Sequence, residues 1–189
     1  MKTNLIPALR MTAVMLVLCS GLYTLAVLGF AKLFAPQSGA AELVQRGGMD
    51  VGAANVGQLF TNNAYFHGRP SAVDYNAQGS GGTNKGPSNP DHLAVVEARI
   101  DTFLVHNPSV QRAAIPSELM TASGSGLDPH LSVGAATAQA ERIATARGLN
   151  VADVHELIKG HTNGPLLGLF GPSTVNVLEL NLALDALKH

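Results

Sequence analysis

MTAVMLVLCSGLYTLAVLGFA, residues 11–31, contains no charged side chain and lies between Arg10 and Lys32. In an α-helix each residue adds about 1.5 Å, so this run would extend about 31 Å. The hydrocarbon core of a bilayer is about 30 Å thick. The run therefore predicts a membrane-spanning helix, to which we assign residues 11–33, preceded by a short N-terminal segment, residues 1–10.

A cleaved signal peptide is the alternative reading of this run. It also begins with charge, and small residues follow here at Ser38, Gly39 and Ala40. The apolar region of a signal peptide is only about 7–15 residues long, however, so a permanent anchor is favoured.

Positive charges near the run predict its orientation. Lys2, Arg10 and the amino terminus precede the run, whereas only Lys32 follows closely. Cytoplasmic flanks carry the excess of Lys and Arg. We therefore expect a cytoplasmic N-terminus, with everything after the helix on the outer side of the membrane.

Charge and cysteine content restrict what the rest of the chain does. After residue 33 the chain has 9 basic and 13 acidic side chains, a composition that argues against nucleic-acid binding and against a polybasic membrane surface. The single cysteine, Cys19, lies inside the apolar run, so the outer part has neither disulfides nor thiolate zinc sites. No histidine pair has metal-binding helical spacing, and we expect no metal site.

The remaining sequence predicts one mixed domain. Residues 34–48 are expected to be a linker, and residues 49–189 an extracytoplasmic α+β domain. Within it, residues 76–90 are rich in glycine, proline and asparagine, which predicts a loop.

Three helices and one strand are expected after this loop. Asn89 and Pro90 are typical of a helix start, and this helix should end near His106, since Asn107 precedes proline. A second helical region should follow Ser132 and stop at Gly148, and a third should extend from Asn150 to Gly160. The C-terminal residues 174–188 partly alternate in polarity, which favours a strand.

The stretch TASGSGLDPHLS, residues 121–132, combines potentially reactive side chains with glycines. A hydrolase nucleophile is typically flanked by glycine two residues before and two after the serine, but Ser125 has Ser123 and Leu127 there. Serine, glycine and aspartate are also ordinary turn residues. A turn is therefore favoured, and an outer-face hydrolase using Ser125 and His130 is the alternative.

The stretch SGGTNKGPSNP, residues 80–90, is similar to a phosphate-binding loop only in composition. Such a loop requires Gly-Lys-Ser/Thr at its end, whereas here Lys85 precedes Gly86 and a proline follows.

Several long motifs, taken in order, resemble one protein family over essentially the whole chain. They are the N-terminal apolar run, YFHGRPSA (65–72), SGGTNKGPSNP (80–90), TASGSGLDPHLS (121–132), AQAERIATARGL (138–149) and NVLELNLALD (176–185). Together they resemble the C subunit of the bacterial Kdp potassium-transporting P-type ATPase.

This resemblance implies a non-catalytic accessory subunit of a high-affinity potassium import complex in the bacterial inner membrane. It implies three protein partners, namely a potassium-translocating A subunit, an ATP-hydrolysing B subunit and a small F subunit, together with membrane lipid. The implied role is to support assembly and to act as a catalytic chaperone that raises the affinity of the B subunit for ATP. The resemblance implies no cofactor held by this chain itself, and ATP only through the complex.

The two glycine-rich loops are then expected to be docking or fold-defining surfaces, because glycine permits close approach of backbones. The first loop contributes Gly81, Gly82, Asn84, Gly86, Pro87, Asn89 and Pro90. The second contributes Ser123, Gly124, Ser125, Gly126, Asp128, Pro129 and His130.

Overall fold

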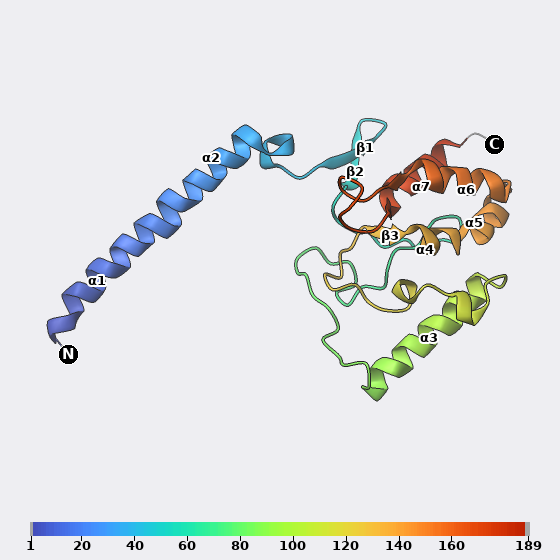
Figure 1. Cartoon of the computed structure of the whole chain (residues 1–189), viewed down its shortest axis with the longest axis horizontal. Helices are drawn as coiled ribbons and strands as arrows, with labels where there is room; N and C mark the ends of the chain where they lie inside the picture. Colours follow the sequence, from blue (N-terminus) through green and yellow to red (C-terminus); the bar gives the residue numbers. More distant parts are fainter. Residues whose placement is uncertain (1, 188–189) are drawn as a thin grey trace. The chain divides into compact units, whose positions relative to one another are not determined.

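The computed structural model describes residues 2–187, which form two compact units (Figure 1). The first unit ends at Glu42 and the second begins at Leu43.

The first unit is one long apolar helix followed by a short turn. It comprises α1 (Lys2–Leu16), a π-helical segment η1 (Val17–Tyr23), α2 (Thr24–Phe34) and the 3₁₀ segment η2 (Pro36–Gly39). Residues 4–34 form a helix long and apolar enough, by length and composition, to cross a membrane.

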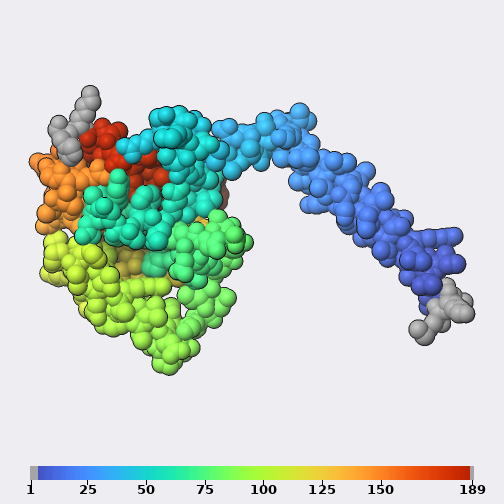
Figure 2. Space-filling view, turned by 180° about the vertical axis from the view of Figure 1, so that it is seen from behind, coloured from blue at the N-terminus to red at the C-terminus, as the bar shows by residue number. Residues whose placement is uncertain are grey.

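The second unit begins with an antiparallel hairpin of β1 (Leu43–Arg46) and β2 (Met49–Ala53). Segment η2 and strand β1 thus occupy part of the expected linker, residues 34–48. Within the described residues, the stretch 54–89 contains neither helix nor strand. This irregular stretch, turquoise to green in Figure 2, covers much of one face of the unit.

Helix α3 (Pro90–His106) and two 3₁₀ turns, η3 (Arg112–Ala114) and η4 (Ser117–Leu119), follow the irregular stretch. The predicted start of α3 is confirmed, because the Asn89 side chain accepts a hydrogen bond from the His92 backbone amide at 3.0 Å.

A small antiparallel sheet and four helices make up the rest of the unit. Strand β5 (Thr174–Asn176) lies between β3 (His130–Ser132) and β4 (Thr162–Asn163). The α+β class predicted from the sequence is confirmed. The helices are α4 (Val133–Thr137), α5 (Ala140–Arg147), α6 (Val151–Gly160) and α7 (Val177–Ala186).

One hydrophobic core joins the sheet to these helices. Its fully buried side chains include Phe66, Leu131, Ile143, Ile158 and Leu180. Helix α3 packs on this core through side chains that are only partly buried, among them Ile100 and Phe103.

The strand expected over residues 174–188 is wrong beyond Asn176. The Asn176 side chain accepts hydrogen bonds from the backbone amides of Leu178 and Glu179, which caps a helix there. The buried positions that follow are Leu178 and the series Val177, Leu180, Asn181 and Leu184. The spacing of three and four residues in this series is helical, so the alternation of leucines was misleading.

The expected helical region after Ser132 is present as two helices. Ser132 caps α4 through its hydroxyl, and Gly148 ends α5 in the left-handed conformation, as predicted. Between the two helices the chain turns at Gln139, whose buried side chain bonds to another part of the chain.

That other part is the irregular segment 62–68, whose backbone is held by side chains. Asn181 pairs with both the amide and the carbonyl of Phe66, and Gln139 pairs in the same way with His67. Arg142 donates to the carbonyls of Asn63 and Tyr65. Buried backbone groups need such partners, and here distant side chains substitute for a neighbouring strand.

Arg142 is the centre of this arrangement. Its side chain also donates to Asn107 Oδ1 at 3.1 Å and to Gln139 Oε1 at 2.8 Å, so that its partners are all uncharged. Burial lowers the pKa of the guanidinium to about 10. Arg142 therefore remains charged at neutral pH, and the N–H groups of its guanidinium donate hydrogen bonds to four acceptors.

A second polar junction joins the segment to α7. Asp185 accepts hydrogen bonds from Arg147, Arg46 and Tyr65. Burial raises the pKa of the Asp185 carboxyl, but these three hydrogen bonds outweigh burial and hold the pKa below its ordinary value. The first hairpin, the irregular segment and α7 thus meet at one carboxylate.

We expect Arg142→Met to destabilise the domain by about 2–5 kcal/mol, because several acceptors that Arg142 pairs are left without a donor. Methionine has a side chain of roughly similar length, so the substitution removes the donors more than the packing. Denaturant unfolding of the full chain in detergent measures the loss. The exposed Arg112→Met is the matched control and should unfold near the wild-type midpoint. Equal midpoints for the two variants would contradict a central role for Arg142.

Candidate functional site

The structure brings parts of the two predicted loops into contact. The amide of Gly81 donates to the Ser125 carbonyl at 2.8 Å, and the Ser80 hydroxyl donates to the same carbonyl at 3.1 Å. The loops are 45 residues apart in sequence at this contact. They therefore form one surface.

Glycine is required at one position of this surface. Gly126 has φ +71°, and a Cβ atom there would lie 2.6 Å from Val73 Cγ2 and 2.9 Å from the Gly81 carbonyl oxygen. Gly124, two residues earlier, has open space around the corresponding position. The close approach of the two loops thus depends on Gly126 and not on Gly124.

The serine hydroxyls of the second loop stabilise its turn. Ser123 Oγ accepts a hydrogen bond from the Gly126 amide at 2.9 Å, and Ser125 Oγ accepts one from the Leu127 amide at 3.1 Å. Among residues 2–187, no hydrogen bond joins Ser125 to His130. The hydrolase alternative is therefore unsupported.

Asp128 and His130 lie at the end of the same loop. Asp128 accepts a hydrogen bond from the His130 backbone amide at 3.0 Å, while the His130 ring nitrogen lies 3.9 Å from the carboxylate. Asp128 also forms an ion pair with Arg69 at 3.1 Å. The aspartate thus joins the second loop to the irregular stretch 54–89. Pro129, between the two, accepts a backbone hydrogen bond from the Val177 amide.

The rest of the first loop takes no part in this contact surface. Asn84, Gly86 and Pro87 are exposed, and Asn89 and Pro90 form the start of α3. The predicted site residues therefore fall into two groups. One group contacts the second loop, and the other forms the exposed turn and the helix cap.

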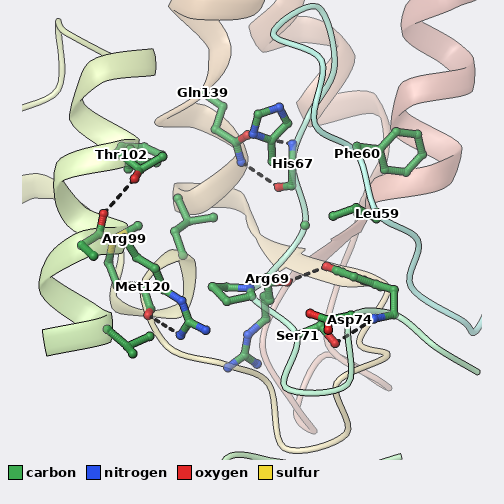
Figure 3. Close-up of a pocket in the computed structure, with 17 residues that line it drawn as sticks. Leu59, Phe60, His67, Arg69, Ser71, Asp74, Arg99, Thr102, Met120 and Gln139 are labelled. Atoms are coloured by element: carbon green, nitrogen blue, oxygen red, sulfur yellow. Dashed lines mark hydrogen bonds between the residues drawn. The ribbon is translucent and has the colours of Figure 1, made fainter. Parts of the chain in front are cut away.

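A cleft of about 490 Å³ lies between the irregular stretch 54–89, α3 and residues 119–120 (Figure 3). Figure 3 shows His67 and Gln139 at one end of it and Arg69, Ser71 and Asp74 at the other. Ligand pockets in proteins have volumes of about 300–1,000 Å³, so this cleft is large enough for a small molecule or an inserted peptide side chain.

Two arginines contribute donors to the cleft. Arg99 donates to the Met120 carbonyl at 3.1 Å, and burial lowers the pKa of its guanidinium. Arg69 lies against Tyr75, whose hydroxyl donates to the Arg69 carbonyl, and Nε of Arg69 is buried without a partner. Burial, with a further contribution from Asp128, raises the pKa of Tyr75 to about 12, so the phenol stays protonated.

His67 is neutral at the other end of the cleft. Burial and, secondarily, the positive charge of Arg142 lower its pKa to about 4. Its Nε2 lies 3.1 Å from the Asn62 carbonyl oxygen, which can only accept, so this nitrogen carries the proton. His67 is thereby fixed as a structural donor.

The residues that line the cleft carry no local sequence pattern that marks them as a site. The two sides of the cleft come from residues 20 or more positions apart, and the motif YFHGRPSA supplies residues 67–71 to one of them. Chemically, the cleft offers hydrogen-bond donors over an apolar floor, which suits binding. Within residues 2–187 no cluster of histidine, cysteine, aspartate or glutamate suits a metal ion.

These features define a small protein class with one long apolar helix and one α+β domain whose serine and aspartate side chains stabilise turns. The family model of the K⁺-transporting ATPase c chain, KdpC, matches residues 5–186. The chain belongs to this family.

Curated relatives match over the full length. A potassium-transporting ATPase KdpC subunit from Bacteroides fragilis is 49% identical over 191 residues, which cover 100% of both chains. The corresponding subunit of Flavobacterium johnsoniae is 50% identical over 185 residues, covering 98% of this chain and 99% of the relative. The corresponding subunit of Polaromonas naphthalenivorans is 48% identical over 191 residues, covering 100% of this chain and 97% of the relative.

We expect Gly126→Ala to destabilise the domain by at least about 1 kcal/mol, because alanine is strained at positive φ and collides with the first loop. Gly124→Ala is the matched control, since its Cβ enters open space. Thermal unfolding and limited proteolysis of the full chain compare the two. Equal stability, with both loops equally resistant to protease, would show that the loops do not need this contact.

Proposed function

We propose that this chain is a non-catalytic accessory subunit of an ATP-driven potassium import complex. In this proposal it contacts a potassium-translocating A subunit, an ATP-hydrolysing B subunit and a small F subunit. It supports their assembly and raises the affinity of the B subunit for ATP. The observation that carries the proposal is the match to KdpC subunits over residues 5–186, at close to half identity.

The geometry of the joined loops supports a docking role. Ser123 and Ser125 accept hydrogen bonds from backbone amides of their own turn, so both hydroxyls contribute to the rigidity of the loop. The loops are fixed by cross-loop hydrogen bonds and by the Asp128–Arg69 ion pair, so they are preorganised. A preorganised surface binds a partner with less loss of conformational entropy.

We further propose that the helix over residues 11–33 spans the bacterial inner membrane once, with the N-terminus in the cytoplasm. The domain that begins after it then lies outside. ATP is cytoplasmic, so an effect on ATP affinity must be transmitted through the complex. Docking of the domain on the A subunit, near the potassium entrance, is the simplest arrangement that satisfies this constraint.

Orientation is tested by cysteine labelling in intact cells. The background variant is Cys19→Ser, and Ala77→Cys then places one thiol on the exposed loop of the domain. A membrane-impermeant maleimide should label Ala77→Cys in intact cells, and should label Asn4→Cys only after permeabilisation. The reverse pattern would place the domain in the cytoplasm and permit direct contact with ATP.

The regulatory role is tested by potassium-stimulated ATPase activity of the purified complex, with and without this subunit, across ATP concentrations. We expect less of the complex to assemble without the subunit, and the ATP concentration at half-maximal rate to rise several-fold in the fraction whose other subunits remain associated. If they dissociate completely instead, the chain acts in assembly and the proposed effect on ATP affinity loses its support.

Variants in the joined loops refine this test. Asp128→Ala and His130→Ala should weaken assembly or transport, because Asp128 fixes both Arg69 and the turn that carries His130. Glu156→Ala, on the exposed side of α6, is the control and should assemble as the wild type does. Normal assembly and transport by both loop variants would exclude this surface as a docking site.

A further inference from the structure

The connection between β4 and β5 exposes a compact group of large apolar side chains. Its residues 164–173 have the sequence GPLLGLFGPS. The exposed fractions are 69% for Leu166, 82% for Leu167, 81% for Leu169 and 63% for Phe170. Between Lys159 and Glu179 the chain has no aspartate, glutamate, lysine or arginine.

This apolar hairpin, defined as residues 165–170, is an ordered turn. Leu166 and Phe170 exchange backbone hydrogen bonds at 2.8 and 3.0 Å, and the Gly168 amide donates to the Pro165 carbonyl at 2.9 Å. The backbone therefore fixes the side chains at the surface and prevents them from collapsing onto the core.

The backbone conformation of Leu167 indicates that the exposure of the apolar hairpin has a role other than folding of the domain. It has φ +55°, a conformation that asparagine and glycine adopt far more readily than leucine. An exposed leucine in this conformation gains nothing from the core of its own domain. Strained backbone of this kind is concentrated at sites of function.

The hairpin lies on the side of the domain where the chain enters it. Strand β5 leads from the hairpin to Asn176, whose side chain donates to the Ala54 carbonyl, directly after β2. Figure 1 shows the connection in red on the β2 side of the domain. The hairpin and the β1–β2 pair, where the domain begins, thus share one end of the domain.

The chain limits how far this end can move from the apolar helix. Helix α2 ends at Phe34 and β1 begins at Leu43. The connection between them, residues 35–42, reaches at most about 29 Å when fully extended. The start of the domain therefore stays within about 29 Å of the end of the apolar helix.

The chemistry of the hairpin favours lipid over a protein partner. Its side chains are those of proline, leucine, glycine and phenylalanine, none of which donates or accepts a hydrogen bond. Protein interfaces combine apolar contacts with about one hydrogen bond per 100–200 Å² and a polar rim. A lipid surface accepts leucine and phenylalanine side chains without such pairing.

We propose that the apolar hairpin inserts into the outer leaflet of the bilayer and provides a second attachment of the domain to the membrane. The inference rests on the proposed membrane span of residues 11–33. With two attachments, the domain is held in one orientation on the membrane surface.

The chain contains no tryptophan, so a single substitution provides a unique fluorescent reporter. The full chain carrying Phe170→Trp is reconstituted into phosphatidylcholine vesicles whose acyl chains are brominated. Bromine quenches tryptophan only at close range, so Phe170→Trp should lose most of its emission, and its emission maximum should lie at short wavelength.

Two reporters serve as controls. Leu25→Trp lies in α2 and reports the membrane span, and Val105→Trp lies at the end of α3, where Val105 is 78% exposed. Quenching of Phe170→Trp and Leu25→Trp, but not of Val105→Trp, supports the inference. Adding Leu167→Asn to Phe170→Trp keeps a residue suited to positive φ and should reduce the quenching.

The remaining outcomes overturn the inference in distinguishable ways. Quenching of Leu25→Trp without quenching of Phe170→Trp refutes insertion and leaves the membrane span intact. Failure to quench Leu25→Trp refutes the span, and the inference falls with it. Shielding of Phe170→Trp that occurs only with the other subunits present, and without quenching by brominated lipid, assigns the hairpin to a protein partner.

Discussion

The buried guanidinium of Arg142 supplies hydrogen bonds to a segment that has no neighbouring strand. Within residues 62–68 Phe66 is fully buried and residues 64–68 are otherwise partly buried, where unpaired backbone groups are costly. Arg142, Gln139 and Asn181 provide the missing partners. The same segment leads into Arg69, which fixes Asp128 and with it the second loop. The cleft and the joined loops both depend on this replacement of a strand by side chains.

Local signals in the sequence were sufficient for most helix boundaries. Asparagine caps at Asn89 and Asn150 and the glycine stop at Gly148 act through bonds within a few residues, so they are readable without the fold. The C-terminal segment was misread because leucines at 180, 182 and 184 satisfy two periodicities at once. Asn176 decides between them by capping a helix, and the buried positions then follow its period.

The sequence predicted that the candidate site contains a turn, but not which distant residues contact that turn. Glycine and serine at residues 123–126 indicated a turn, and the hydroxyls do stabilise one. The contact between Gly81 and Ser125 and the ion pair of Arg69 with Asp128 join residues more than 40 positions apart. No local pattern encodes such pairings. The cleft was missed for the same reason, because its sides come from separate parts of the chain.

The distance in sequence between Phe66 and Asn181 also affects how the protein is made. At about 5–20 residues per second, roughly 6–23 s of synthesis separate these two residues, which lie 115 positions apart. During that interval the segment 62–68 has emerged while one of its hydrogen-bonding partners has not been translated. The domain therefore completes its fold only after α7 has been translated, and a chain truncated before α7 lacks the carboxamide that pairs with Phe66.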